Sequence, residues 1–425
     1  MEGIKNISLG DKINLTLIPG EKFKSNLVSI YIQRLLDKEE VTKNALIPDV
    51  VTSGSMKYPS AREISNELDN LYGSSMGADI TKRGERQVLS FKIISTNERY
   101  LDEKIFKDVI EFFNDVVNNP LVIDGGFKEE YLNIEKQNLK DRIQAKINDK
   151  GRYALERAFE EMCEGEKYSI SEYGYEEDID KITPKELYDH YREILRTSPI
   201  DIVVEGDFDE DEVIKIITEN FKFERGEIID IPRDEFKKDI KEVKNIHEKI
   251  DITQGKLIMG YRSNIDYLDE GEYYTLVVGS NILGGGPDSK LFINVREKES
   301  LCYYVYSSVE KYKGILFVSS GIEAENYEKT VKLINEQLEK LKNGDISEQE
   351  LQNSKSALIS SMITISDSIG GRSDFYFAQA MGKTNSTIDS IIDKLSKVSI
   401  EDIVEVVKDI KLDTVYFLSK QGGII

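Results

Sequence analysis

The chain has 425 residues, with 39% hydrophobic and 32% charged side chains and a formal net charge of −22. This length exceeds one ordinary hydrophobic core and predicts more than one domain. The acidic balance argues against binding to a nucleic-acid backbone, which requires clustered lysine and arginine, and it is compatible either with a merely solvated surface or with basic peptide ligands.

The amino-terminal half of the chain is predicted to place its strands first and its helices afterwards. Alternating apolar residues indicate antiparallel strands, and longer periodic stretches that follow glycine or serine indicate helices. The expected elements, in chain order, are strands at 12–19 and 25–35, a helix that begins near Ser60, a hairpin at 74–95, helices from about 102 to 196 and a strand at 200–206.

The carboxy-terminal half repeats this order. Its expected elements are a strand at 256–263, helices near 269–284 and 287–298, a hairpin at 302–322, helices from about 323 to 410 and a strand at 413–419. Strands and helices that come in blocks are typical of the α+β class. We therefore expect two duplicated α+β domains, each a mostly antiparallel sheet covered by helices.

Three pairs of similar segments, in the same order, also indicate an internal duplication. The pairs are 53–75 with 283–308, 147–162 with 365–381, and 180–194 with 396–410. In the third pair, Thr183 and Ser399 each precede a carboxylate by three residues and are expected to cap a helix. Sequence domains are predicted at 1–222 and 249–425, joined by an exposed, charge-dense linker at 223–248.

The two cysteines, Cys163 and Cys302, have no paired spacing. A disulfide framework or a thiolate zinc site is therefore not expected, and both residues are predicted to be small buried hydrophobes. No segment reaches the roughly 20 apolar residues of a membrane helix, and the first residues do not form a secretory signal. These features predict a cytoplasmic protein without a membrane partner.

The two histidines, His190 and His247, are far apart, and neither has a second histidine at metal-ligand spacing. A zinc site built from histidines of this chain is excluded on these grounds, and no GxSxG elbow supports a serine triad. Both histidines are expected at the surface or on the flank of a helix.

Two further segments could carry chemistry. The glycine run LGGGPDSKLF (283–292) does not match a phosphate-binding motif, so a close backbone approach is the preferred interpretation. In NVREKESLCYYVYSS (294–308), Arg296 and Tyr303 could bind a peptide carbonyl or an oxyanion together. The alternative for this pair is a surface ion pair and a tyrosine in the sheet core.

Over nearly its full length, the chain resembles the M16 family of metallopeptidases, in its two-domain M16B type. LGGGPDSKLFINVREKESLCYYV is similar to the family's glycine turn and its Leu-Arg-Glu and Gly-Leu-Ala-Tyr pattern, in which Arg296 and Tyr303 match the substrate-binding pair. Ser300 stands where the family usually has glycine, and Cys302 where it has alanine. In EEYLNIEKQNL, Glu135 matches the position of the family's third zinc ligand.

The family's His-x-x-Glu-His motif precedes a Gly-Thr pair, which Gly54 and Ser55 match here. The two histidine positions are then Ala45 and Asp49, and the glutamate position is Pro48. Two of three zinc ligands and the general base are missing, so no zinc or other cofactor is expected in this chain. Pro48 also predicts that any helix here begins at or just before it.

The resemblance implies a non-catalytic subunit that binds and positions a peptide for a partner M16 subunit with an intact HxxEH motif, which would carry the zinc. The peptide is expected to add a strand to an exposed sheet edge. The alternative is a peptide-binding or scaffold protein, as a single chain or as a homodimer, without a role in proteolysis. Nothing in the sequence singles out a carboxylate pair for an independent enzyme.

Overall fold

The computed structural model describes residues 3–420, which divide into two compact units. Each unit is assembled from three stretches of the chain. Unit 1 comprises Met1–Gln144, Ile170–Pro232 and Asp367–Asn385. Unit 2 comprises Ala145–Ser169, Arg233–Ser366 and Ser386–Ile425. Each unit includes a segment from the other half of the chain, so the units are not the continuous ranges 1–222 and 249–425. Those ranges describe the predicted sequence duplication and stay a prediction.

Unit 1 is built on a six-stranded sheet with the order β1-β2-β8-β3-β5-β4. Its strands are β1 (Lys5–Gly10), β2 (Ile13–Pro19), β3 (Ser25–Leu35), β4 (Ser75–Arg83), β5 (Arg86–Thr96) and β8 (Ile200–Gly206). Neighbouring strands are antiparallel except for β2 and β8, which are parallel. The last strand of the half-chain, β8, therefore separates the first hairpin from β3.

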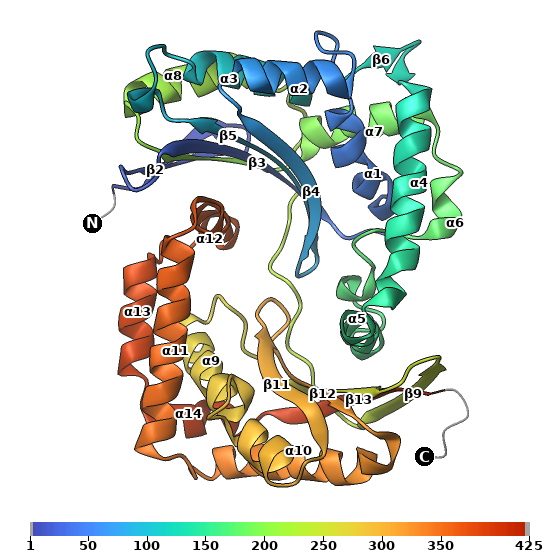
Figure 1. Ribbon diagram of the computed structural model, residues 1–425, viewed down its shortest axis with the longest axis vertical. Coiled ribbons are helices and arrows are strands. Elements are labelled where there is room, and N and C mark those ends of the chain that lie inside the picture. The colour runs from blue at the N-terminus through green and yellow to red at the C-terminus, as the bar shows by residue number, and fades with distance from the viewer. Residues whose placement is uncertain (1–2, 421–425) are drawn as a thin grey trace. The chain divides into compact units, whose positions relative to one another are not determined.

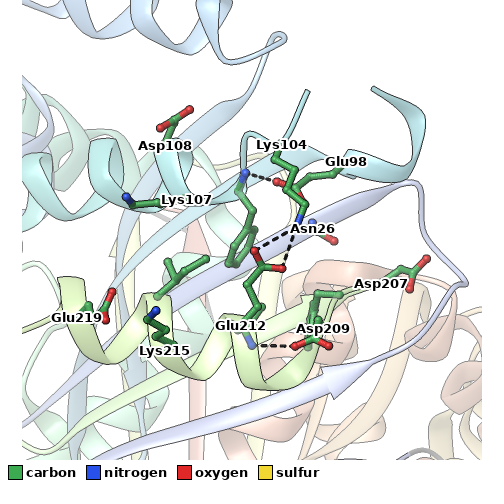
Figure 2. A pocket seen from close by; sticks show the side chains of 14 residues that line it. Asn26, Glu98, Lys104, Lys107, Asp108, Asp207, Asp209, Glu212, Lys215 and Glu219 are labelled. Carbon is green, nitrogen blue, oxygen red and sulfur yellow. Dashed lines mark hydrogen bonds and ion pairs between the residues drawn. The ribbon is translucent and has the colours of Figure 1, made fainter. Parts of the chain in front are cut away.

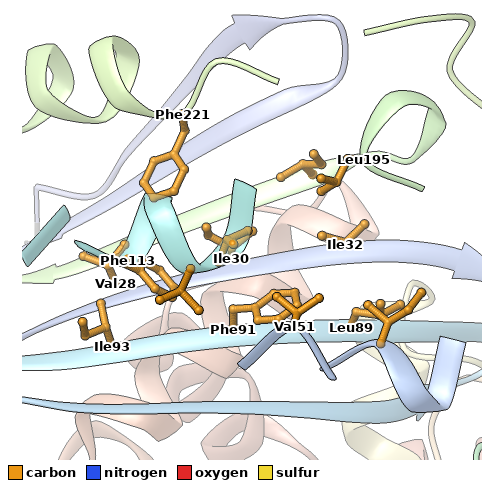
Figure 3. Packing of buried hydrophobic residues seen from close by; sticks show 14 of the residues in the cluster. Val28, Ile30, Ile32, Val51, Leu89, Phe91, Ile93, Phe113, Leu195 and Phe221 are labelled. Carbon is orange, nitrogen blue, oxygen red and sulfur yellow. The ribbon is translucent and has the colours of Figure 1, made fainter. Parts of the chain in front are cut away.

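The central strand β3 is buried on both of its faces. Ile30 and Ile32 point into the main core, which helices on one face of the sheet complete with residues such as Phe113 and Leu195 (Figure 3). Between them, Tyr31 points to the opposite face and stacks on Phe377, with ring centroids 4.0 Å apart. A strand covered on both faces needs apolar or satisfied side chains at every position, and this explains its near-continuous apolar run.

Two helices of unit 1 begin where the sequence predicts. α2 begins after Ser60, which caps it, and Thr183 caps α7 by accepting from the amide of Glu186, as predicted. The helices are α1 (Val41–Thr52), α2 (Ala61–Asn70), α3 (Phe106–Asn118), α4 (Glu129–Ala145), α6 (Glu176–Ile179), α7 (Pro184–Thr197) and α8 (Glu210–Asn220). A short ribbon of β6 (Val122–Ile123) and β7 (Gly126–Phe127) precedes α4.

Unit 2 has a five-stranded sheet with the order β11-β12-β10-β13-β9. Its strands are β9 (Lys244–Ile250), β10 (Gly255–Arg262), β11 (Cys302–Glu310), β12 (Ile315–Ile322) and β13 (Lys411–Lys420). β13 and β9 are parallel and all other pairs are antiparallel, which reproduces the pattern β4-β5-β3-β8-β2 of unit 1. The predicted fold class, two duplicated α+β domains, is thus confirmed.

The helices of unit 2 follow the predicted blocks. Ser399 caps α14 in a capping box with Asp402, as expected. The helices are α9 (Glu270–Gly284), α10 (Tyr327–Lys342), α11 (Glu348–Ser366), α13 (Ile388–Lys397) and α14 (Ile400–Val407), with a short π-helical turn η4 at Phe292–Glu297. The predicted linker 223–248 lies mainly outside regular structure, but its last residues belong to β9.

The two units exchange one helix each (Figure 1). In unit 2, α5 (Lys150–Met162) packs Ala154 and Ala158 against the β10 and β13 face of the sheet. In unit 1, α12 (Ile369–Gly382) lies on the face of the sheet opposite the main core, where the side chains of Arg372 and Glu205 form a buried ion pair. These two helices are the second pair of similar segments found in the sequence.

Candidate functional site

The segment at the degenerate zinc motif is the buried helix α1, which runs from Val41 to Thr52 with Pro48 inside it. The prediction that a helix would begin at or just before Pro48 is wrong. An interior proline costs about 3 kcal/mol because its nitrogen cannot donate to the preceding turn. Most residues of α1 are buried, on all sides of the helix, and this packing offsets the loss.

Ala45, Pro48 and Asp49 therefore share one helix, with Ala45 and Asp49 one turn apart. Ala45 is 1% exposed and contributes a methyl group to the core of unit 1. Pro48 is also buried and offers no donor or carboxylate. Of the three, only Asp49 has a polar side chain, so α1 packs into the core and supplies neither a histidine nor a glutamate at these positions.

The facing helix α4 contacts Asp49 and Ser53 of α1. Arg142 donates to the carboxylate of Asp49 at 3.0 Å, and the two side chains are 37% and 31% exposed. At the C-cap of α1, the hydroxyl of Ser53 donates to the backbone oxygen of Asp49 at 2.9 Å and also lies 3.3 Å from Oε1 of Glu135. Asn138 donates to the other oxygen of Glu135 at 2.9 Å. The structure thus brings Asp49 and Glu135 to the same α1–α4 interface, with each carboxylate partnered.

The residues at this interface do not fit a zinc ion. Zinc requires three protein ligands with nitrogen, sulfur or carboxylate donors, and the methyl group of Ala45 is no donor. The carboxylate of Asp49 is engaged by a guanidinium, which is a cation already. Among residues 3–420, no group of three or more histidine, cysteine, aspartate or glutamate side chains is placed to hold a metal ion.

His190 reaches the same helix from α7, which sequence reasoning did not foresee. Its Nε2 lies 2.7 Å from Oδ1 of Asn44, a buried residue of α1. Because Nδ2 of Asn44 donates to Gln87 at 2.8 Å, the amide oxygen faces the imidazole and Nε2 is the donor. Burial lowers the pKa of His190 to about 4, so the ring is neutral near pH 7. No local pattern in the sequence marks this long-range contact.

In unit 2, Arg296 lies in the π-helical turn η4 and presents a loosely paired guanidinium. Its Cζ lies 4.6 Å from the ring centroid of Phe292, one turn earlier. Among the described residues its ion-pair partner is the neighbouring Glu297, whose oxygen is 3.9 Å from Nε, and the Arg296 side chain is 37% exposed. The guanidinium therefore rests on an aromatic face with much of its hydrogen-bonding edge available.

Tyr303 follows at the start of β11 and is 76% exposed, so the alternative of a tyrosine in the sheet core is wrong. The register explains this exposure, because Cys302 pairs with Ile322 and Tyr304 with Gly321, which leaves Tyr303 as the extra residue of a β-bulge. Cys163 is fully buried as expected, whereas Cys302 is half-buried. The structure places Arg296 and Tyr303 in consecutive elements of unit 2.

The departure at Ser300 and the glycine run at 283–292 can both be interpreted from the backbone. Ser300, just before β11, has a φ of +51°, the left-handed conformation that glycine adopts without strain. At Gly284, a Cβ atom would lie 2.5 Å from the amide nitrogen of Ser307, so this glycine lets α9 approach β11 closely. The preferred interpretation of the glycine run, a close backbone approach, agrees with this geometry.

A cavity of about 350 Å³ lies elsewhere in unit 1, between α3 and α8 (Figure 2). Lys104 crosses it to Glu212 at 3.2 Å, and Glu98 accepts from the amide of Phe106 at 2.6 Å. Asp209 caps α8 at the same place. These charged groups serve one another and the helix ends, and none of the predicted site residues lines the cavity.

Comparisons with known proteins agree on one family. A family model described as "Peptidase M16 inactive domain" matches residues 181–358. The chain is 37% identical over 411 residues to "Probable inactive metalloprotease YmfF" of Bacillus subtilis, covering 96% of each chain.

Two solved structures share the fold over almost the whole chain. One is a conserved protein from Enterococcus faecalis, with a TM-score of 0.91, 28% identity and coverage of 99% and 100% of the two chains. The other is a peptidase M16 inactive domain from Pseudomonas fluorescens, with a TM-score of 0.80, 18% identity and coverage of 100% and 99%.

No helix among residues 3–420 is long and apolar enough to cross a membrane. The predicted family and the expectation of a non-catalytic member are both confirmed by these similarities and by the composition of the α1–α4 interface. The chain therefore belongs to the M16 peptidase family, as a member that lacks the residues for zinc catalysis.

Proposed function

We propose that this chain is a cytoplasmic, non-catalytic subunit that binds a peptide and positions it for a partner M16 subunit with an intact HxxEH motif. The partner carries the zinc ion and the general base, since Ala45 and the paired Asp49 of this chain supply neither. The peptide is held by the side chains of Arg296 and Tyr303 and by the backbone of the edge strand β11.

The observation that carries this proposal is the presentation of Tyr303. A tyrosine that is 76% exposed on a bulge is maintained against the tendency of aromatic side chains to be buried, and bulges commonly re-aim a side chain near a functional site. β11 is an edge strand of its sheet, so its outer backbone groups can pair with an added peptide strand. The loosely paired Arg296 offers a donor to a peptide carbonyl.

The test begins with a pull-down of this chain from native lysate, followed by zinc measurement on the complex and on the isolated chain. The expected result is an HxxEH-containing partner, zinc in the complex in a stoichiometry set by the partner, and peptidase activity only in the complex. Stoichiometric zinc and peptidase activity in the isolated chain would refute the proposal.

Substitutions then separate a positioning subunit from a scaffold. Tyr303→Ala and Arg296→Ala are expected to raise the KM of the reconstituted pair for peptide while the complex still assembles. Tyr100→Ala, which removes a tyrosine 51% exposed in unit 1, is the matched control and leaves the KM unchanged. If all three variants retain full activity, the chain serves only as a scaffold.

A further inference from the structure

Unit 2 contains a second polar cavity, of about 870 Å³, that none of the predicted site residues lines. It lies where the start of α5 meets the loop between β9 and β10, on the face of the sheet that α5 covers. Its lining residues are Asn148, Asp149, Lys150, Gly151, Asp251, Ile252, Thr253, Gln254, Lys256 and Lys420. Three lysines against two aspartates give this cavity a positive balance, in a chain whose net charge is −22.

The ammonium group of Lys256 is the central feature of this cavity. It donates to Oε1 of Gln254 at 3.1 Å and lies 5.1 Å from the ring centroid of Tyr304. Among residues 3–420 it forms no ion pair with a carboxylate. Burial lowers the pKa of Lys256, and the more distant charge of Asp149 raises it in part. A half-buried ammonium held by neutral groups lacks the counter-ion that would stabilise its charge.

The groups that hold Lys256 fit together because residue 321 is glycine. A Cβ atom at Gly321 would lie 2.6 Å from the ring of Tyr304 and 2.7 Å from Oε1 of Gln254. Any side chain on this strand position would displace both groups. The contacts of the ammonium thus come from Tyr304 of β11 and from Gln254 in the loop before β10, and both groups pack over Gly321 of β12.

The two aspartates of the cavity do not form ion pairs with its lysines among the described residues, so the lysines can bind an anion. Asp149 is committed to the start of α5, where one oxygen accepts from the amides of Gly151 at 3.1 Å and Arg152 at 3.0 Å. Asp251 is exposed on the loop, and neither aspartate pairs with a lysine of the cavity among the described residues. Lys150 and Lys420 add two further cations without an acidic partner in the described chain.

We propose that the cavity around Lys256 binds a carboxylate group of the peptide ligand. The carboxylate is either the terminal one or that of an acidic side chain, and both would supply the missing counter-ion by a charge-assisted hydrogen bond. Tyr304, whose ring supports Lys256, directly follows the bulge residue Tyr303 in β11, so one lysine of the cavity contacts the neighbour of the exposed tyrosine. In naming a peptide, this inference rests on the proposed function.

The first experiment uses small probes and the isolated chain, labelled with ¹³C at the Cε atoms of its lysines. N-acetylglutamine carries only the α-carboxylate, N-acetylglutamate α-amide only the side-chain carboxylate, and N-acetylglutamine amide carries neither. One or both carboxylate probes are expected to shift the Lys256 signal and raise the pKa of its ammonium, while the neutral probe does not. Lys256→Gln assigns the signal. Absence of any shift with all three probes overturns the inference.

The second experiment compares three fluorescent decapeptides that differ only at their last residue. One carries only the α-carboxylate, one carries only a side-chain carboxylate, and one carries neither. The carboxylate form recognised by the cavity is expected to bind about 10-fold more tightly than the neutral form. Lys256→Gln removes this difference, Lys256→Arg retains part of it, and Lys332→Gln, which deletes an exposed lysine of α10, retains all of it. Equal binding of all peptides to the wild-type chain would overturn the inference that the cavity binds a carboxylate, but it would leave the proposed function unaffected. If the small carboxylates bind at Lys256 and no peptide binds, the proposed function fails and the cavity stands as a carboxylate site.

Discussion

Asp49 on α1 is joined to Arg142 on α4 by an ion pair of 3.0 Å, at the position where the family pattern places a metal ligand. A guanidinium thus balances the carboxylate at this position of the helix. We expect the pair to contribute about 0.5 kcal/mol to the free energy of unfolding, because both side chains are about one-third exposed and solvent screens the interaction.

A double-mutant cycle with Asp49→Asn and Arg142→Gln, measured by urea denaturation, would give this coupling directly. The interaction should shrink as salt is added, since exposed pairs are screened. Strictly additive single and double substitutions would mean that the two helices are held together by other contacts alone.

His190 makes stability depend on pH. Burial lowers its pKa to about 4 in the folded chain, whereas the unfolded value is 6.5, so the unfolded state binds more protons between these values. The contribution is complete above pH 6.5 and is lost as pH falls toward 4, by up to about 3 kcal/mol. Urea denaturation of wild type and His190→Gln across this range measures the difference.

The variant keeps a donor toward Asn44 but cannot titrate, so its free energy of unfolding should fall less steeply with acid. Asn245→Gln, at an exposed position of the edge strand β9, removes no titratable group and is the control that should keep the wild-type slope. Parallel curves for wild type and His190→Gln would contradict the assignment of a neutral, buried imidazole.

Ser300 carries backbone strain that a glycine would relieve. Its φ of +51° costs a non-glycine residue about 1 kcal/mol, and a β-branched side chain about twice that. Ser300→Gly is therefore expected to retain or raise the free energy of unfolding, and Ser300→Val to lower it by about 1–2 kcal/mol. Ser308→Val, at an exposed position of the regular part of β11, should have little effect.

Phe292 is expected to position Arg296. The ring is only partly buried and supports the guanidinium at 4.6 Å, an interaction of about 0.5–1 kcal/mol at an exposed site. Phe292→Leu should weaken peptide binding about two- to five-fold without lowering the melting temperature strongly, and Phe292→Tyr should restore it. An upfield ring-current shift of the Arg296 Nε–H signal, lost in the leucine variant, would report the stacking independently of any ligand. Equal peptide affinity in all three proteins would assign the phenylalanine a packing role instead.

The exchanged helix α12 is anchored to unit 1 by a buried charge pair. Arg372 and Glu205 are 5% and 2% exposed, so removing one partner leaves the other charge desolvated. Arg372→Met is expected to destabilise the chain by about 3–5 kcal/mol, and the double substitution with Glu205→Leu to recover much of this. Arg152→Ala, on the other exchanged helix, breaks an exposed pair with Glu156 and should cost under about 1 kcal/mol. Thermal unfolding gives the ranking, and an equal, small effect of both arginines would contradict the anchoring role.

Several elements could be predicted because their signals are local. Thr183 and Ser399 cap helices as expected, since a short hydroxyl side chain satisfies amides within three residues. The alternating and continuous apolar runs gave the hairpins and the central strands, because side-chain periodicity follows directly from strand geometry. Once the family resemblance aligned the zinc motif, residue types also showed that Ala45 and Pro48 cannot serve as a metal ligand and a general base, because neither side chain has a donor atom.

Other features depended on contacts between distant segments. The helix through Pro48 exists because burial on all sides outweighs a local penalty, and burial is not visible within a short window. The exposure of Tyr303 comes from a register shift against β12. The carboxylate of Asp49 forms an ion pair because Arg142 lies opposite it on another helix. The amino-acid sequence by itself determined the duplicated α+β plan and the loss of zinc chemistry, because both are written in periodicity and in residue types. Only the tertiary structure decided the helix exchange, the pairing of Asp49 with Arg142 and the position of Lys256 without a carboxylate partner among residues 3–420, because each depends on which distant side chains share a low-dielectric space.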